Sequence, residues 1–240
     1  MQENLIRLNK FISSTGFCSR READQLIEQK RVMVNGKVAE LGTKVSDADE
    51  ILVDGKSIRK KQSLLYIAFH KPRGIICTTE RDVKDNIIDY IRHPVRIFPI
   101  GRLDRASEGL IFLTNDGDIV NKILRAGNNH EKEYVVNVNK PVTDDFVQRM
   151  SNGIPILDTV TKKCFVERTG KFQFRIILTQ GLNRQIRRMC DYLEYEVTQL
   201  RRIRIMNITL AGIKAGEWRE FTKQEMDEIN KLIANSSKTA

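Results

Sequence analysis

The hydrophobic positions of the first sixty residues change from helical to alternating spacing. Leu8, Phe11 and Ile12 recur at helical spacing, and the stretch SRREADQLIEQKR places Ser19 and Glu22 as a capping box would. The segments VMVNGKV and ILVDGKSI then alternate, and each contains an Asn-Gly or Asp-Gly dipeptide that tolerates the positive φ angles of tight hairpins. The pattern predicts two short helices followed by a small sheet.

After a basic run at 59–61, longer strand-like runs dominate. LLYIAFHKPRGIICTT predicts a strand, a turn and a second strand, and further strands are expected in GLIFLT, KEYVVNV, KFQFRIILTQ and QLRRIRIMNITL. Helical spacing occurs in DIVNKILR, TDDFVQRMSNG, NRQIRRMCDYL and TKQEMDEINKLIANS.

Because these helices do not alternate strictly with the strands, a mixed, largely antiparallel sheet is favoured over a doubly wound one. We therefore predict an α+β fold in which residues 62–240 form this sheet with flanking helices. Residues 1–61 are expected to form a separate, small N-terminal α/β domain.

The amino-acid composition indicates which class of molecule the protein binds. The 41 basic and 31 acidic residues give a formal net charge of +10, which favours a polyanionic partner, RNA or DNA rather than a membrane. The four cysteines lie far apart without a CxxC pair, and only three histidines could assist them, so four reduced thiols and no metal site are expected. No apolar run has the length of a signal h-region or a membrane span, and we expect a cytoplasmic location.

The stretch GRLDRASEGLIFLTNDG places one carboxylate, Asp104, between Arg102 and Arg105 in a loop flanked by glycines. An aspartate in such a loop commonly caps a helix or holds a turn. Here a strand follows instead of a helix, and Gly101 and Gly109 leave room for another backbone to approach closely. We expect the neighbouring arginines to keep Asp104 ionised, as a nucleophile or base requires.

Two further features have both a functional and a structural interpretation. In GLNRQIRRMCDYL a helix would place Arg184, Arg187 and Arg188 on one face, which could be an ordinary solvated face or the wall of a pocket at a strand end. Tyr134, in HEKEYVVNV, starts a strand, where a tyrosine usually packs in the core.

The N-terminal segment, in RLNKFISSTGFCSRREADQLIEQKRVMVNGKV and DEILVDGK, resembles the αL RNA-binding domain of the small-subunit ribosomal protein S-four family. The resemblance implies a module that docks its two helices on structured RNA by shape and backbone contacts. Lys10, Arg20, Arg21 and Arg31 would form its phosphate-facing rim, unless they are simply a solvated helix face.

From residue 65 to about 222, the stretches KPRG, GRLDRASEGLIFLTNDG, KEY and GLNRQIRRM occur in the order and spacing of the RsuA-like branch of pseudouridine synthases. The stretches NKILRAGNNHEKEYVV, MSNGIPILDTVTKKC and GLNRQIRRMC are most similar to a subgroup that modifies large-subunit (23S) ribosomal RNA, with a transfer RNA as a further candidate substrate.

The resemblance implies catalysis without a cofactor. It makes Asp104 the catalytic aspartate, Arg187 its ion-pair partner, Tyr134 the ring that stacks on the target base and Arg102 the side chain that enters the RNA. Lys71 belongs to an element that supports the active-site floor. The RNA contacts expected in all are Arg102, Arg105, Lys71, Arg184, Arg188, Lys10, Arg20, Arg21 and Arg31.

The reaction fits these residues. Breaking a glycosidic bond builds positive character on the sugar, which one carboxylate can stabilise, capture or relieve by taking a sugar proton, and the base must be flipped out of its stack. The expected partner is ribosomal RNA, free or in an assembling large subunit, and the expected state is a monomer. The alternatives are a non-catalytic ribosome-assembly factor, an RNA glycosidase, and the same chemistry on small-subunit ribosomal RNA.

Overall fold

The computed structural model describes residues 5–59 and 63–236, which form two compact units. The N-terminal unit extends to Leu64 and also includes residues 115–117. The second unit begins at Leu65 and contains the main sheet. The predicted domain boundary between 61 and 62 falls at a segment outside the described residues.

The N-terminal unit has the predicted order of two helices and a small sheet. Its helices are α1 (Leu8–Ser14) and α2 (Arg20–Glu28), and Ser19 and Glu22 form the predicted capping box at the start of α2. The four-stranded sheet has the order β3-β2-β5-β6, with β2 (Val32–Val34), β3 (Lys37–Val38), β5 (Ile51–Val53) and β6 (Lys56–Ser57), and β1 (Ile6–Arg7) pairs separately with β4 (Lys44–Val45). The Asn-Gly and Asp-Gly dipeptides have positive φ angles at both residues, so both predicted hairpins are confirmed.

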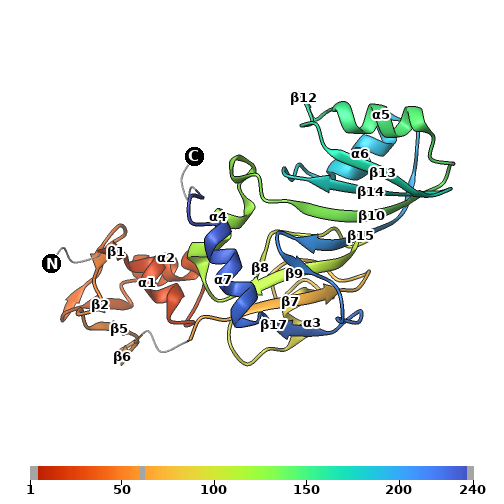
Figure 1. The fold of residues 1–240 in the computed structure, drawn as a ribbon. Helices are drawn as coiled ribbons and strands as arrows, with labels where there is room; N and C mark the ends of the chain where they lie inside the picture. The colour runs from red at the N-terminus through yellow and green to blue at the C-terminus, as the bar shows by residue number, and fades with distance from the viewer. Residues whose placement is uncertain (1–4, 60–62, 237–240) are drawn as a thin grey trace. The chain divides into compact units, whose positions relative to one another are not determined.

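The second unit is built on a mixed sheet of order β13-β14-β10-β15-β9-β7-β17, to which β8 and β16 are added beside β9 and β15 (Figure 1). Among the described residues, each pairing in this sheet is antiparallel except that of β9 with β15. The α+β class and the largely antiparallel sheet are therefore confirmed. The strands are β7 (Tyr66–Lys71), β8 (Phe98–Ile100), β9 (Glu108–Thr114), β10 (Lys132–Val138), β13 (Phe165–Gly170), β14 (Gln173–Leu178), β15 (Val197–Ile205), β16 (Ile208–Thr209) and β17 (Trp218–Glu220), with a small hairpin of β11 (Pro155–Ile156) and β12 (Thr159–Val160) outside the sheet.

Helices cover both faces of the sheet. The central strand β9 is apolar on both faces, so each face needs a covering layer. Leu110 and Phe112 join the core formed with α4 (Gly117–Leu124) and α7 (Lys223–Leu232), whereas Ile111 and Leu113 join the larger core on the other face. That larger core also receives side chains of α3 (Ile87–Ile91), α5 (Asp144–Asn152) and α6 (Gln185–Tyr192). The predicted capping box at the start of α7, from Thr222 and Glu225, is also present.

The strand predicted after the turn that follows β7 is wrong. Ile76 makes only an isolated bridge to Asn86, and the Ile75 carbonyl accepts a hydrogen bond from Lys71 Nζ at 2.8 Å rather than from a neighbouring strand. The backbone at Ile75 and Ile76 is therefore bound by the buried Lys71 and by the segment before α3. The apolar residues of this stretch do not pair with a strand of the sheet.

Candidate active site

The loop that carries Asp104 joins β8 to β9 and is held by its own backbone groups. Ser107 N donates to Asp104 O at 3.0 Å, and Gly74 N donates to Arg105 O at 2.8 Å. Leu103 N donates to the buried Cys77 Sγ at 3.4 Å. These bonds fix the loop on both sides of Asp104, whose side chain is 37% exposed.

Two arginines of the α6 region reach Asp104. Arg184 Nη1 lies 3.7 Å and Arg187 Nε lies 3.8 Å from Asp104 Oδ2. Arg184 precedes α6 in a left-handed conformation with φ of 49°, and its side chain is 50% exposed, whereas that of Arg187 is 13% exposed. Both distances are those of ion pairs rather than of hydrogen bonds, so Asp104 keeps its acceptor lone pairs for a ligand.

Hydrogen bonds to other groups fix the guanidinium of Arg187. Its Nη1 donates to Val197 O at 3.2 Å and its Nη2 donates to Ser107 Oγ at 3.3 Å. Burial lowers the pKa of Arg187, and Arg184 lowers it further while Asp104 opposes this. An arginine stays charged despite such a shift, so a fixed cation faces the carboxylate.

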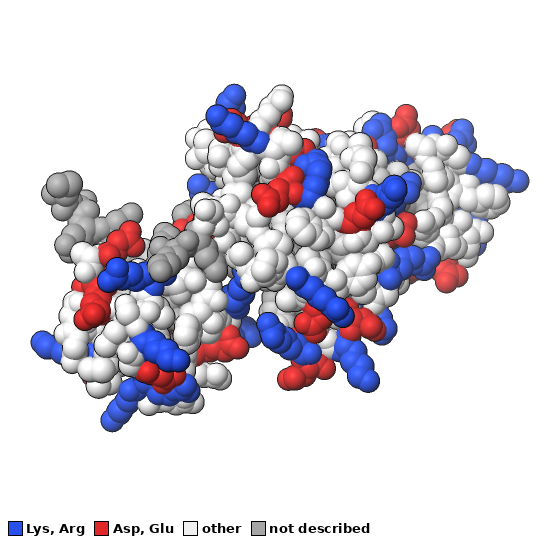
Figure 2. All heavy atoms as spheres, turned by 90° about the horizontal axis from the view of Figure 1, so that it is seen from below, with Lys and Arg blue, Asp and Glu red and all other residues white. Residues whose placement is uncertain are grey.

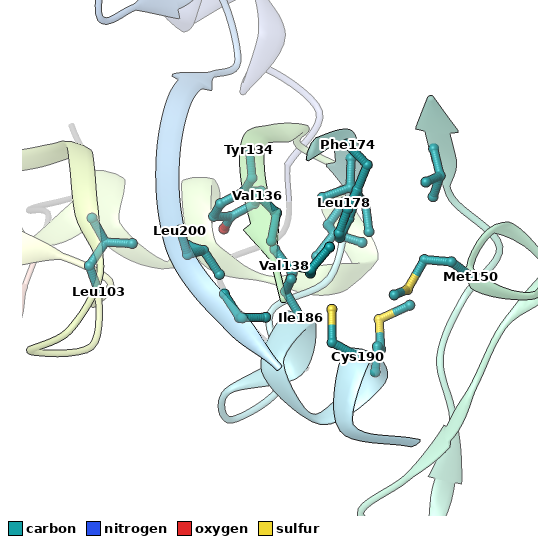
Figure 3. Packing of buried hydrophobic residues seen from close by; sticks show 14 of the residues in the cluster. Leu103, Tyr134, Val136, Val138, Met150, Phe174, Leu178, Ile186, Cys190 and Leu200 are labelled. Atoms are coloured by element: carbon teal, nitrogen blue, oxygen red, sulfur yellow. The ribbon is translucent and has the colours of Figure 1, made fainter. Parts of the chain in front are cut away.

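Asp104 opens into a cleft of about 100 Å³. Tyr134 of β10 lines the same cleft and is 9% exposed, so its ring forms part of the wall. Apolar side chains of the larger core, Leu103, Ile186 and Leu200, line the rest of it with polar groups from the segment before α6. Figure 3 shows Tyr134 on β10 beside Leu200, with its phenol oxygen on the side toward Leu103.

Gly109 supports this arrangement at the parallel junction of β9 and β15. Its φ is +112°, and a Cβ added there would lie 2.2 Å from Arg202 O, so the predicted close backbone approach is confirmed. Arg202 pairs with Gly109 on one side and with Tyr134 on the other, and β15 therefore ties the Asp104 loop to the tyrosine strand.

The predicted site residues are only partly brought together. Asp104, Tyr134, Arg187, Arg184 and Arg102 all line the cleft. The expectation that Arg105 crowds Asp104 is wrong, because its Nη2 pairs with Asp85 Oδ2 at 3.0 Å and its Nε donates to Gly74 O at 3.1 Å. The two arginines that pair with Asp104 are Arg187 of α6 and Arg184 just before it, rather than a neighbour in its own loop.

Arg188 does not share the position of the other two α6 arginines. Its Nε donates to Asn183 O at 3.1 Å and its Nη2 donates to Asn183 Oδ1 at 3.3 Å, and it does not line the cleft. Arg184 is the N-cap residue of α6, and of the three arginines predicted to share a face only Arg184 and Arg187 reach Asp104.

Lys71 does not suit the predicted RNA contact. It is 0% exposed, and its Nζ donates to Pro72 O at 2.9 Å and to Ile75 O at 2.8 Å. Burial lowers its pKa, and electrostatic interactions with Cys77, Asp104 and Glu108 act in the opposite direction. An ammonium enclosed in this way cannot reach a phosphate.

In the N-terminal unit, Arg20 and Arg21 are exposed at the start of α2 and Lys10 is half-buried on α1. Arg31 forms a two-bond ion pair with Asp54, at 2.7 Å and 2.6 Å, and this bond raises the pKa of Arg31. On the face in Figure 2, basic and acidic side chains are interspersed, so positive charge is not gathered into one patch there.

Two residues of the site were not predicted. Ser107, 2% exposed, accepts the hydrogen bond that orients Arg187, and Arg202, 4% exposed, lies behind Tyr134. Ser107 stands within the stretch that suggested the site, but a serine in a loop carries no signal for this role. Arg202 is one of three arginines in a strand and has no distinguishing spacing.

In the part of the chain described, no group of three or more His, Cys, Asp or Glu side chains could hold a metal ion, and the four cysteines are free. Among the helices at 5–59 and 63–236, none has the length and apolarity of a membrane span.

The cleft lining contains one carboxylate, Asp104, faced by guanidinium groups and an aromatic ring. The neighbouring Glu108 lies outside that lining and accepts a hydrogen bond from Gln199 Nε2 at 2.8 Å. Most glycoside hydrolases need a second carboxylate to protonate the leaving group or activate water. A single acid fits a reaction in which a cleaved base is kept and rejoined rather than released.

Models of two known protein families match the two units of this chain. The model of the RNA pseudouridylate synthase family matches residues 65–192, and that of the S4 domain matches residues 6–51. Two relatives are named Dual-specificity RNA pseudouridine synthase RluF. The protein of Salmonella typhi is 58% identical to this chain, and the match covers 98% of this chain and 82% of that protein. The protein of Escherichia coli is 56% identical, and the match covers 99% of this chain and 82% of that protein.

Ribosomal large subunit pseudouridine synthase B of Bacillus subtilis is 35% identical over 98% of this chain and 99% of that protein. A solved structure described as a crystal structure of pseudouridylate synthase aligns with a TM-score of 0.69 and 27% identity over 93% of this chain and 99% of that one.

Proposed function

The chain belongs to the RNA pseudouridine synthase family and is an isomerase, and on this premise we propose that it converts a specific uridine of large-subunit (23S) ribosomal RNA to pseudouridine, with Asp104 as its catalytic carboxylate. The family expected from the sequence motifs is confirmed. The observation that carries the proposed role is the cleft itself, in which Asp104 is the one carboxylate of the lining.

The reaction balances without any added group. The bond between the ribose C1′ and the uracil N1 breaks, the uracil turns within the cleft, and a bond forms between C1′ and C5. The hydrogen on C5 leaves as a proton and N1 gains one, so no oxidant or reductant is required. Asp104 stabilises the electron-poor sugar or takes part in covalent capture or proton abstraction, and all three demand an ionised carboxylate.

The surrounding residues each perform one part of this work. Arg187, fixed by Val197 and Ser107, orients and stabilises the Asp104 carboxylate. Tyr134 stacks on the flipped base and excludes water while the glycosidic bond is open. Arg102, exposed at the cleft, enters the RNA where the base leaves, and so offsets the few kcal/mol that unstacking costs.

The choice of substrate rests on the relatives and on the N-terminal module. The Bacillus subtilis relative is named for the large ribosomal subunit, and the RluF proteins are named for dual specificity. We infer large-subunit ribosomal RNA, free or in an assembling subunit, as the substrate, with a transfer RNA as the second. The exposed Arg20 and Arg21 of the S4 domain would contact RNA backbone, Arg184 would contact it at the cleft, and the protein would act in the cytoplasm as a monomer.

Purified protein should be incubated with ribosomal RNA transcribed with uridine tritiated at C5. The proposal predicts tritium release to water, an equal yield of pseudouridine after nuclease digestion, and no free uracil. Free uracil would instead identify a glycosidase. Tight binding without tritium release would identify a non-catalytic RNA-binding factor, and release from small-subunit RNA alone would overturn the proposed substrate.

A further inference from the structure

Arg202 is a buried cation with few partners. It is 4% exposed, its Nε donates to Leu110 O at 2.7 Å, and its Nη2 is buried without a hydrogen-bond partner among the described residues. Burying a guanidinium in this way is costly, because each of its donors loses water. A well-packed apolar side chain would be the less expensive choice for a purely structural position.

The contact that Arg202 does make is with the ring of the cleft tyrosine. Its guanidinium carbon lies 5.9 Å from the centroid of the Tyr134 ring, which is within the range of a cation–π interaction. Tyr134 lines the cleft and Arg202 does not, so the guanidinium supports the ring from within the protein while the ring presents itself to the cleft.

The strand arrangement makes this contact specific to Arg202. In the antiparallel pairing of β10 with β15, Tyr134 lies opposite Arg202, directly after a register shift between Glu133 and Tyr134. On the other side, Arg202 lies opposite Gly109, where the absence of a Cβ admits its backbone. The same residue thus links the Asp104 loop strand to the tyrosine strand.

Two nearby lysines increase the free-energy cost of burying the charge of Arg202. The charge of Arg202 lowers the pKa of both Lys71 and Lys132, although burial is the larger cause for each. Lys132 is 7% exposed and its Nζ donates to His130 O at 3.2 Å. Arg202 is therefore close enough to repel two other buried cations, and a benefit to function would explain why its charge is retained.

We propose that Arg202 is a positioning residue for the isomerisation: it holds the Tyr134 ring in the orientation that stacks on the flipped uracil, and so acts on the rate through Tyr134. The inference rests on the proposed function and assigns a role to a residue that makes no contact with substrate. Because a cation–π contact is strongest at a desolvated site, its loss should lower the rate by roughly tenfold or more.

A double-mutant cycle separates this role from a general structural one. Single-turnover rates of pseudouridine formation and RNA dissociation constants should be measured for the wild type, Arg202→Met, Tyr134→Leu and the double variant, with reactions followed for hours so that slow variants are measured. Arg201→Met is the matched control, because Arg201 is exposed on the same strand.

The proposal predicts that Arg202→Met lowers the rate about tenfold or more while RNA affinity stays within about threefold. In the Tyr134→Leu background the same change should have little further effect, and Arg201→Met should have none in either background. An equal rate loss from Arg202→Met in both backgrounds would overturn the proposal, since Arg202 would then act independently of the ring.

Melting curves check that each variant is folded. If Arg202→Met does not fold, Arg202→Lys replaces it, and its rate loss should likewise disappear in the Tyr134→Leu background; a persisting loss would overturn the proposal. An inactive wild type would instead be a failure of the proposed function, whereas an active wild type with independent effects would refute only the role of Arg202.

Discussion

Replacing Arg187 by methionine tests how Asp104 is held. The substitution removes the less exposed of the two cations at the carboxylate and its hydrogen bonds to Val197 and Ser107. We expect slower isomerisation with nearly unchanged RNA affinity, because the Arg187 side chain is only 13% exposed and its donors are bound to protein groups. Arg184→Met is the matched comparison, since its nitrogen lies 3.7 Å from the same oxygen but its side chain is 50% exposed.

The expected magnitude follows from the distances. Two unit charges about 4 Å apart interact by about 4 kcal/mol at an effective dielectric constant of about 20. The Asp104 side chain is 37% exposed, so solvent screening reduces the contribution of Arg187 to about 1–2 kcal/mol. At about 1.4 kcal/mol per factor of ten, the rate should fall by roughly tenfold. The more exposed Arg184 should contribute less than about 1 kcal/mol, which is a loss of roughly two- to fivefold.

Single-turnover kinetics with excess enzyme measures the chemical step, and filter binding measures affinity separately. Arg187→Lys should give an intermediate rate, because it retains the charge but not the fork that reaches both Val197 and Ser107. The reasoning is refuted if Arg187→Met keeps the wild-type rate, or if Arg184→Met is the slower of the two.

Three further changes test the supporting structure. Gly109→Ala should prevent folding of the sheet unit, because the new methyl group would meet a backbone oxygen at 2.2 Å, whereas Gly117→Ala, with nothing within 4 Å, should melt like the wild type; equal melting temperatures would contradict this. The pKa of Lys132 is lowered to about 8 by burial, so the unfolded chain binds more protons between pH 8 and 10.5, and this group's contribution to the free energy of unfolding should rise across that range. Lys132→Met should remove about 3 kcal/mol of that pH dependence in denaturant titrations, and an unchanged dependence would show that another group causes it. The hydrogen bond from Arg219 lowers the pKa of Glu225, so its stabilisation is present above pH 4.5 and is lost as pH falls through the lowered pKa. Arg219→Met should cost about 1 kcal/mol at pH 7 and progressively less as the pH falls below 4.5, and a cost that stays constant with falling pH would exclude the ion pair as its source.

Features that depend on a few neighbouring residues could be predicted from the sequence. The capping boxes at α2 and α7 and the hairpins at Asn35 and Asp54 are set by residues within a turn of one another, and all are present. The role of Gly109 was also accessible, because a glycine at the start of an apolar strand suggests close backbone approach.

Features that depend on distant segments could not be predicted. Arg105 is next to Asp104 in the chain, but the loop backbone directs it to Asp85, while Arg184 and Arg187, some eighty residues away, supply the charge. Tyr134 lies opposite Arg202 because the pairing of β10 with β15 shifts register between Glu133 and Tyr134. The alternation of residues along β15 does not reveal such a shift. The five-residue α3 is too short for its periodicity to be read.

The most direct test of the central claim is Asp104→Asn, which removes the charge but keeps the shape. Pseudouridine in ribosomal RNA is mapped by carbodiimide treatment and primer extension, and RNA affinity is measured on the same preparation. The account predicts that pseudouridine formation is lost while affinity stays within a few fold of the wild type. Pseudouridine formation at the wild-type rate by Asp104→Asn would contradict it.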